Sequence, residues 1–110
     1  MIYTAIALFS LAAILGLILL SYVLKGKQTP KAVVFTHGPV AALALVLLII
    51  YSTGNTPAPI TSIVLFVIAA LGGVVLVTHD VMGKVIPKWL AVTHGLIAVT
   101  GFLFLLAFAL

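Results

Sequence analysis

The chain has 110 residues, of which 65% are hydrophobic and only 5% are charged, and its mean hydropathy is +1.51. A soluble domain carries about 25% charged residues because most of its surface faces water. This composition excludes a soluble enzyme, a nucleic-acid binder and a disordered tail. The net charge of +4 comes from lysines in two short segments, and the absence of cysteine excludes disulfides, thiolate nucleophiles and iron–sulfur ligands.

Four apolar runs are separated by short polar segments, and they cover residues 1–24, 32–51, 60–78 and 90–110. Each run is close to the roughly 20 residues that a helix needs to cross the hydrocarbon core of a bilayer. The alternating pattern of a membrane β-barrel is absent. The sequence therefore predicts a single all-α domain, an integral membrane four-helix bundle.

The lysines predict how this bundle is oriented. Three of them lie between the first and second runs and two between the third and fourth, whereas segment 52–59 has no charge. Lysine-rich loops tend to remain in the cytoplasm. We therefore expect a protein of the cytoplasmic (inner) membrane with its lysine loops inside and both termini outside. The first run ends without a small-x-small cleavage pattern, so we expect it to be a membrane helix and not a signal peptide.

The sequence contains an internal repeat, because residues 1–53 align with residues 58–110 without a gap. The first copy of the shared motif consists of Gly26, Lys27, Pro30, Lys31, Thr36, His37, Gly38 and Ala41. The second copy consists of Gly83, Lys84, Pro87, Lys88, Thr93, His94, Gly95 and Ala98, and Gly16 likewise aligns with Gly73. Each copy is a helical hairpin, so the two copies enter the membrane in the same direction and are related by a pseudo-twofold axis along the membrane normal.

The repeat places His37 and His94 at the same depth, inside the hydrocarbon and near its cytoplasmic edge. Polar side chains within membrane spans are costly and usually mark a function. Two imidazoles from helices that face each other across a bundle are the axial ligands of a b-type haem. The sequence therefore predicts one haem b, with His37 and His94 as ligands of its iron.

The residues around each histidine support a flat cofactor. Gly38 and Ala41 in one half, and Gly95 and Ala98 in the other, leave room for a macrocycle, and Lys31 and Lys88 are candidates to neutralise its propionates. Small residues at this spacing also allow membrane helices to pack closely without a ligand. In that alternative the histidines donate hydrogen bonds between helices. Another metal, or the magnesium of a chlorophyll, also stays open.

The third histidine, His79, breaks the repeat because its counterpart is Tyr22. One hypothesis is that His79 and Asp80, with Tyr22 opposite, bind and protonate a quinone. The alternative is a polar cap at the end of a helix in which Asp80 pairs with Lys84. A further possibility is that all three histidines hold Zn²⁺ or copper, for which three imidazoles suffice.

Two Thr-His-Gly motifs, at residues 36–38 and 93–95, stand near one end of two helices. In this respect the protein resembles the four-helix membrane haem proteins of the cytochrome b561 type. The resemblance implies electron transfer between donors and acceptors such as quinone or ascorbate. Members of that family usually hold two haems, one near each face, from two histidine pairs. This protein has histidines near one face only, so the resemblance implies one haem and a one-sided relay.

The expected function is therefore that of a small b-type cytochrome or haem-binding subunit of a respiratory or photosynthetic electron-transfer system, and not an enzyme on its own. Its expected partners are the lipid bilayer, other membrane subunits or a second copy of the same protein, and a quinone, but no nucleic acid. The alternative is a haem-free accessory subunit at the edge of a larger membrane complex. Imidazoles that point at the pseudo-axis would favour haem, whereas imidazoles that point outward would favour a pigment.

Overall fold

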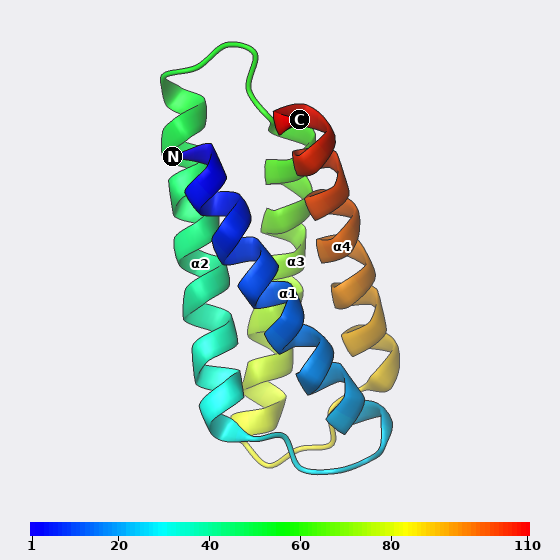
Figure 1. Ribbon diagram of the computed structural model, residues 1–110. Coiled ribbons are helices and arrows are strands. Elements are labelled where there is room, and N and C mark those ends of the chain that lie inside the picture. The colour runs from blue at the N-terminus through cyan, green and yellow to red at the C-terminus, as the bar shows by residue number, and fades with distance from the viewer.

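Each of the four apolar runs forms one helix in a computed structural model that describes all 110 residues (Figure 1). The helices are α1 (Ile2–Leu24), α2 (Lys31–Thr53), α3 (Ile60–Val81) and α4 (Lys88–Ala109), and there is no strand. All four are long and apolar enough to cross a membrane, and the molecule measures 43 Å along its longest axis. The predicted all-α four-helix membrane bundle is confirmed.

Three helices extend slightly beyond the predicted runs, because hydropathy detects the apolar part of a helix and not its polar ends. The lysines that open α2 and α4 are helical, and α3 continues through Asp80. Pro30 and Pro87 stand immediately before α2 and α4 in extended conformation, with ψ of 117° and 119°. The helix α2 continues without interruption through Pro39.

A pair of equivalent glycines ends α1 and α3. Gly26 and Gly83 adopt φ values of 68° and 69°, in the left-handed region that favours glycine. The amide of the following lysine donates a hydrogen bond back to the carbonyl of Tyr22 in one half and of His79 in the other, both at 2.9 Å. This is the Schellman arrangement at a helix C-terminus. The repeated Gly-Lys-x-x-Pro-Lys motif therefore has a structural role, to end one helix and begin the next.

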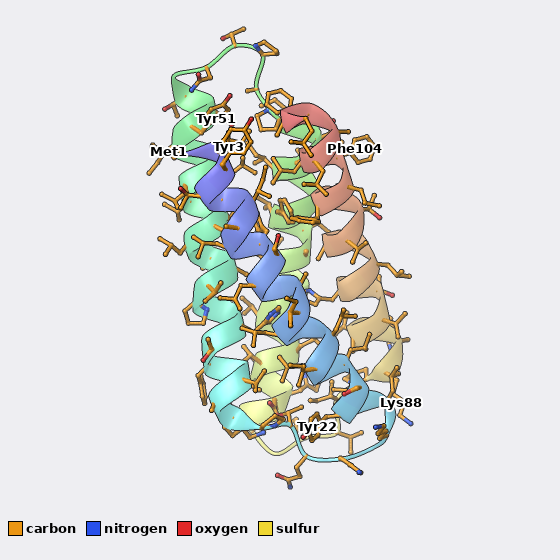
Figure 2. All side chains as sticks on the ribbon, in the orientation of Figure 1. Met1, Tyr3, Tyr22, Tyr51, Lys88 and Phe104 are labelled. Atoms are coloured by element: carbon orange, nitrogen blue, oxygen red, sulfur yellow. The ribbon has the colours of Figure 1, made fainter.

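The helices form two hairpins, α1–α2 and α3–α4, and the hairpins pack so that α1 contacts α4 and α2 contacts α3. The helices α2 and α4 are therefore diagonal partners, as are α1 and α3. Both lysine-bearing loops lie at one end of the bundle, which we call the lysine end, and both termini lie at the other, the terminal end (Figures 1 and 2). The end that faces the cytoplasm stays a prediction.

The closely packed core is confined to the terminal half. It consists of Ile2, Ala5, Phe9, Ala44, Leu48, Phe66 and Leu105. Two pairs of repeat equivalents meet there: Phe9 stacks on Phe66 with ring centroids 3.9 Å apart, and Leu48 and Leu105 are both fully buried. The lysine half contrasts with this core. Between the histidines and the lysine end, the only buried residues are Thr29 and Ala91.

The turn glycines give a first test of the fold. We expect Gly83→Ala to destabilise the protein by about 1–2 kcal/mol, because a Cβ is unfavourable at positive φ. Gly54→Ala is the matched control, since Gly54 also follows a helix but has φ of −113° and open space around its Cα. The measurement is thermal unfolding in detergent. Equal melting temperatures for the two variants would contradict the conclusion that the turn at Gly83 requires a positive φ.

Candidate histidine site at the lysine half of the bundle

The two repeated histidines meet inside the bundle. The ring centroids of His37 on α2 and His94 on α4 are 6.3 Å apart, and the rings are nearly perpendicular, at 82°. Since α2 and α4 are diagonal partners, the two imidazoles reach toward each other across the pseudo-axis. The two histidines stand at the same level of the bundle, and of the two orientations that the sequence allowed, they take the one in which they face each other. Their depth in a membrane stays a prediction.

Each imidazole is held by a backbone carbonyl of the other helix in its own hairpin. The Nδ1 atom of His37 lies 2.9 Å from the carbonyl oxygen of Ala12, and Nδ1 of His94 lies 2.7 Å from that of Ala69. A carbonyl oxygen can only accept, so each Nδ1 carries the proton and donates it. In the neutral imidazole the other nitrogen, Nε2, then keeps a free lone pair.

The helices α1 and α3 make room for these rings with a glycine one turn after the alanine. A Cβ at Gly16 would lie 3.0 Å from Cε1 of His37, and a Cβ at Gly73 would lie 3.2 Å from Cε1 of His94. Any larger residue would displace the ring. Glycines within membrane spans usually allow close contact between helices. What approaches each of these two glycines is a histidine side chain.

Ala12 and Ala69 are site residues that the sequence did not reveal. They are identical in the two repeats and stand four residues before the repeated glycines. The repeated Ala-x-x-x-Gly pattern was the available signal. It did not identify the acceptors, because a backbone carbonyl has no signature of its own in a sequence.

Of the residues expected beside the histidines, the glycines have fewer close neighbours than the two glycines that face the imidazole rings. A Cβ at Gly38 or Gly95 would meet no atom within 4 Å, so no neighbouring helix approaches these glycines. Ala41 and Ala98 are half-buried. The roles of these four residues beside a cofactor stay predictions.

The lysine end carries one polar cluster, which joins the first residue of α2 and the loop before it to the end of α3. Nζ of Lys31 lies 2.6 Å from Oδ1 of Asp80, and the Thr29 hydroxyl donates to Oδ2 at 2.7 Å. The Lys31 ammonium also donates to the Thr29 hydroxyl oxygen at 3.0 Å. The alternative pairing of Asp80 with Lys84 is therefore wrong. Asp80, at the end of α3, lies beside the start of α2, whereas Lys84 follows the reversal at Gly83.

His79 stands apart from the other two histidines. Its Nδ1 lies 2.9 Å from the carbonyl oxygen of Val75 in its own helix, and no hydrogen bond joins it to Asp80 or Tyr22. The protein has no group of three or more metal-ligating side chains. A zinc or copper site made of all three histidines is therefore wrong.

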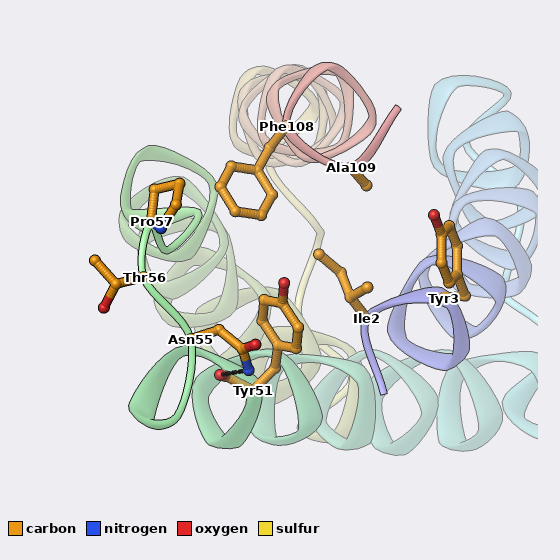
Figure 3. A pocket seen from close by; sticks show the side chains of 8 residues that line it. All are labelled: Ile2, Tyr3, Tyr51, Asn55, Thr56, Pro57, Phe108 and Ala109. Carbon is orange, nitrogen blue, oxygen red and sulfur yellow. Dashed lines mark hydrogen bonds between the residues drawn. The ribbon is translucent and has the colours of Figure 1, made fainter.

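An open cavity of about 430 Å³ lies at the terminal end, far from the histidines (Figure 3). Its lining consists of Ile2, Tyr3, Tyr51, Asn55, Thr56, Pro57, Phe108 and Ala109. The Tyr51 ring stands between Ile2 and Phe108, and the Asn55 amide donates to the backbone carbonyl of Tyr51 at 2.8 Å. The cavity has no histidine, lysine or carboxylate side chain in its lining, and no site was predicted there from the sequence.

Comparisons of the protein with family models, with curated proteins and with solved structures found no match. The resemblance to cytochromes of the b561 type therefore depends on the Thr-His-Gly motifs of this sequence alone.

The fit of each imidazole against its glycine can be tested without any cofactor. We expect Gly16→Ala to lower the free energy of unfolding and to weaken the His37–Ala12 hydrogen bond, because the new Cβ would push the ring away from the α1 carbonyl. The measurements are thermal unfolding and the ¹⁵N and ¹H chemical shifts of the His37 Nδ1–H group.

Gly38→Ala is the matched control. It adds the same methyl group one residue from the same histidine but in open space, so we expect it to be neutral or stabilising by up to about 1 kcal/mol through helix propensity. Unchanged shifts in Gly16→Ala would overturn this account of the glycine.

Proposed function

We propose that this protein is a small b-type cytochrome or haem-binding membrane subunit that relays electrons through one haem held by His37 and His94. The observation that carries the proposal is the meeting of two repeat-equivalent imidazoles across the pseudo-axis, with ring centroids 6.3 Å apart. Each imidazole comes from a different hairpin, so a single iron between them would also join the two halves of the molecule.

The separation suits a metal ligated from both sides. Two imidazoles on opposite sides of one metal, with metal–nitrogen bonds of about 2 Å each, have ring centroids roughly 6 Å apart. The orientation of the rings toward the interior also favours haem over chlorophyll, since a pigment ligated at the edge of the bundle requires imidazoles that point outward. Haem supplies reversible one-electron transfer when it is bound.

The hydrogen bonds at Nδ1 support the same conclusion. A metal-ligating histidine usually donates its other N–H group to a carbonyl or carboxylate, which fixes the tautomer and the ring orientation. The carbonyls of Ala12 and Ala69 provide this for His37 and His94. The lone pair on each Nε2 is thereby kept available for a metal.

The packing around the pair is consistent with a large flat ligand. The stacked phenylalanines and buried leucines lie on the terminal side of the histidines, and on the lysine side only Thr29 and Ala91 are buried. A haem held by this pair would therefore lie on the lysine side of the closely packed core. The propionate roles of Lys31 and Lys88 stay predictions. Lys31 is already paired with Asp80, so the proposal rests on the histidines.

The proposed setting is the cytoplasmic membrane, with the lysine end in the cytoplasm. A single haem near one face makes the protein a one-sided relay, in contrast to the two-haem cytochromes of the b561 type that its motifs resemble. Electrons would then pass to other membrane subunits, to a second copy of the protein or to a quinone.

A second candidate function is a haem-free accessory subunit of a larger membrane complex. The observation that favours it is that each imidazole already donates a hydrogen bond across its hairpin and contacts the other edge to face. Such contacts stabilise membrane helices without any ligand.

An optical spectrum separates the two candidates. We expect the protein, purified after expression with haem available, to show a Soret band and, on reduction with dithionite, sharp α and β bands of a six-coordinate haem. His37→Ala and His94→Ala are each expected to abolish these bands, because each removes one axial ligand. His79→Ala is the matched control and should leave the spectrum unchanged. A colourless wild-type protein would refute the cytochrome and favour the accessory subunit.

A quinone site at the lysine end is a further part of the proposal. The carboxylate of Asp80 is already bound by Lys31 and Thr29. The Nε2 atom of His79 has no partner within the protein, so His79 is the group available to protonate a quinone. Tyr22 has the equivalent position in the other half of the repeat. A quinol that reduces the haem releases protons, and His79 would accept one of them in the reverse of quinone protonation. We therefore expect His79→Gln to slow reduction of the haem by a short-chain quinol at least about tenfold, as loss of a proton-transfer group does. Reduction by dithionite should be unaffected. An unchanged rate with quinol would remove His79 from the mechanism.

A further inference from the structure

The repeat creates two equivalent corners at the lysine end, and their side chains differ in charge. One corner holds Lys31, Thr29 and Asp80 in mutual contact. The equivalent residues at the other corner, each 57 positions away in the sequence, are Lys88, Ile86 and Val23. The lysine is retained, whereas the carboxylate and the hydroxyl are both replaced by apolar side chains.

Lys88 therefore has no internal counter-ion. Asp80 is the only acidic side chain in the protein, and it is already bound to Lys31. The C-terminal carboxylate lies at the opposite end of the bundle (Figure 1). Val23 lies on α1, which packs against α4, the helix that begins at Lys88. In the same way Asp80 lies on α3, which packs against α2, the helix that begins at Lys31. The corner at Lys88 thus has the cation of the first corner without its anion.

The surroundings of Lys88 indicate what kind of anion would bind. Val85 is 90% exposed, Trp89 is 70% exposed and Met82 is 62% exposed, and the ammonium of Lys84 is in the same loop. The equivalents of the first two are Gln28 and Ala32, so the loop of the first half lacks this apolar surface. Exposed tryptophan beside lysine at the end of a membrane helix is typical of the interface between headgroups and hydrocarbon.

We propose that Lys88, with Lys84 and Trp89, binds the phosphate of an anionic membrane lipid, which takes at this corner the place that the Asp80 carboxylate takes at Lys31. The lipid supplies both the negative charge that the protein lacks and acyl groups to cover the exposed apolar side chains. Basic residues beside a membrane span attract anionic lipids in this way. The proposal does not depend on haem, and for Lys88 it is an alternative to the predicted role beside a haem propionate.

The single tryptophan allows a direct test. Full-length protein is placed in vesicles of equal parts phosphatidylglycerol and phosphatidylcholine, with bromine on the acyl groups of only one of the two lipids, and the emission of Trp89 is measured. Bromine quenches only nearby tryptophan, and overall charge and composition are the same in both preparations. We expect brominated phosphatidylglycerol to quench at least about twofold more strongly than brominated phosphatidylcholine, because the lysines enrich it locally.

Two variants identify the corner. Lys88→Gln should bring the quenching ratio toward one, and so should Val23→Asp, which keeps every lysine and supplies an internal carboxylate at the position equivalent to Asp80. Lys27→Gln is the matched control, because it removes the same charge from the other loop, and it should keep the wild-type ratio. A wild-type ratio of one would overturn the proposal. It would also be overturned if Lys88→Gln left the ratio unchanged, or if Lys27→Gln lowered it as much as Lys88→Gln does.

Discussion

The hydrogen bonds from His37 to the Ala12 carbonyl and from His94 to the Ala69 carbonyl are the interactions on which the site depends. Within a bilayer there is no water to replace a lost partner, so a polar side chain in a span must find one in the protein. The bond holds each ring between the helices of its hairpin, and this requires glycine at positions 16 and 73. It also places the proton on Nδ1, and so leaves Nε2 as the atom that can bind a metal.

The pseudo-twofold axis divides the bundle into two regions with different properties. On the terminal side, Phe9 stacks on Phe66 and two leucines are fully buried. Equivalent residues of the two repeats therefore pack together around the axis in this half. On the lysine side the axis is occupied by the two imidazoles, and few residues beyond them are buried. The packed half keeps the helices in register, while the other half holds the two imidazoles at a fixed separation. This division is what makes the histidine pair a candidate cofactor site.

The departures from symmetry occur at the lysine end. Tyr22 and Val23 of the first repeat are replaced by His79 and Asp80 in the second, and one corner therefore has an internal ion pair that the other lacks. A duplicated hairpin would by itself give two corners with the same side chains. These replacements make the two corners differ in charge and in hydrogen-bonding groups. The quinone and lipid proposals are both derived from this difference, and they concern opposite corners of the same end.

The sequence by itself determined the four spans, the common level of the two histidines in the bundle, and the end of the bundle that carries the lysines. These properties depend on hydropathy and on spacing between residues, which are local. Only the tertiary structure decided that the imidazoles face each other, that their partners are the Ala12 and Ala69 carbonyls, and that Asp80 pairs with Lys31 and not with Lys84. The physical reason is that these helices are apolar on every side, so the sequence has no polar face that would indicate how each helix is rotated about its own axis. That rotation is set by packing between helices, through the fit of histidine rings against glycines and of phenylalanine against phenylalanine.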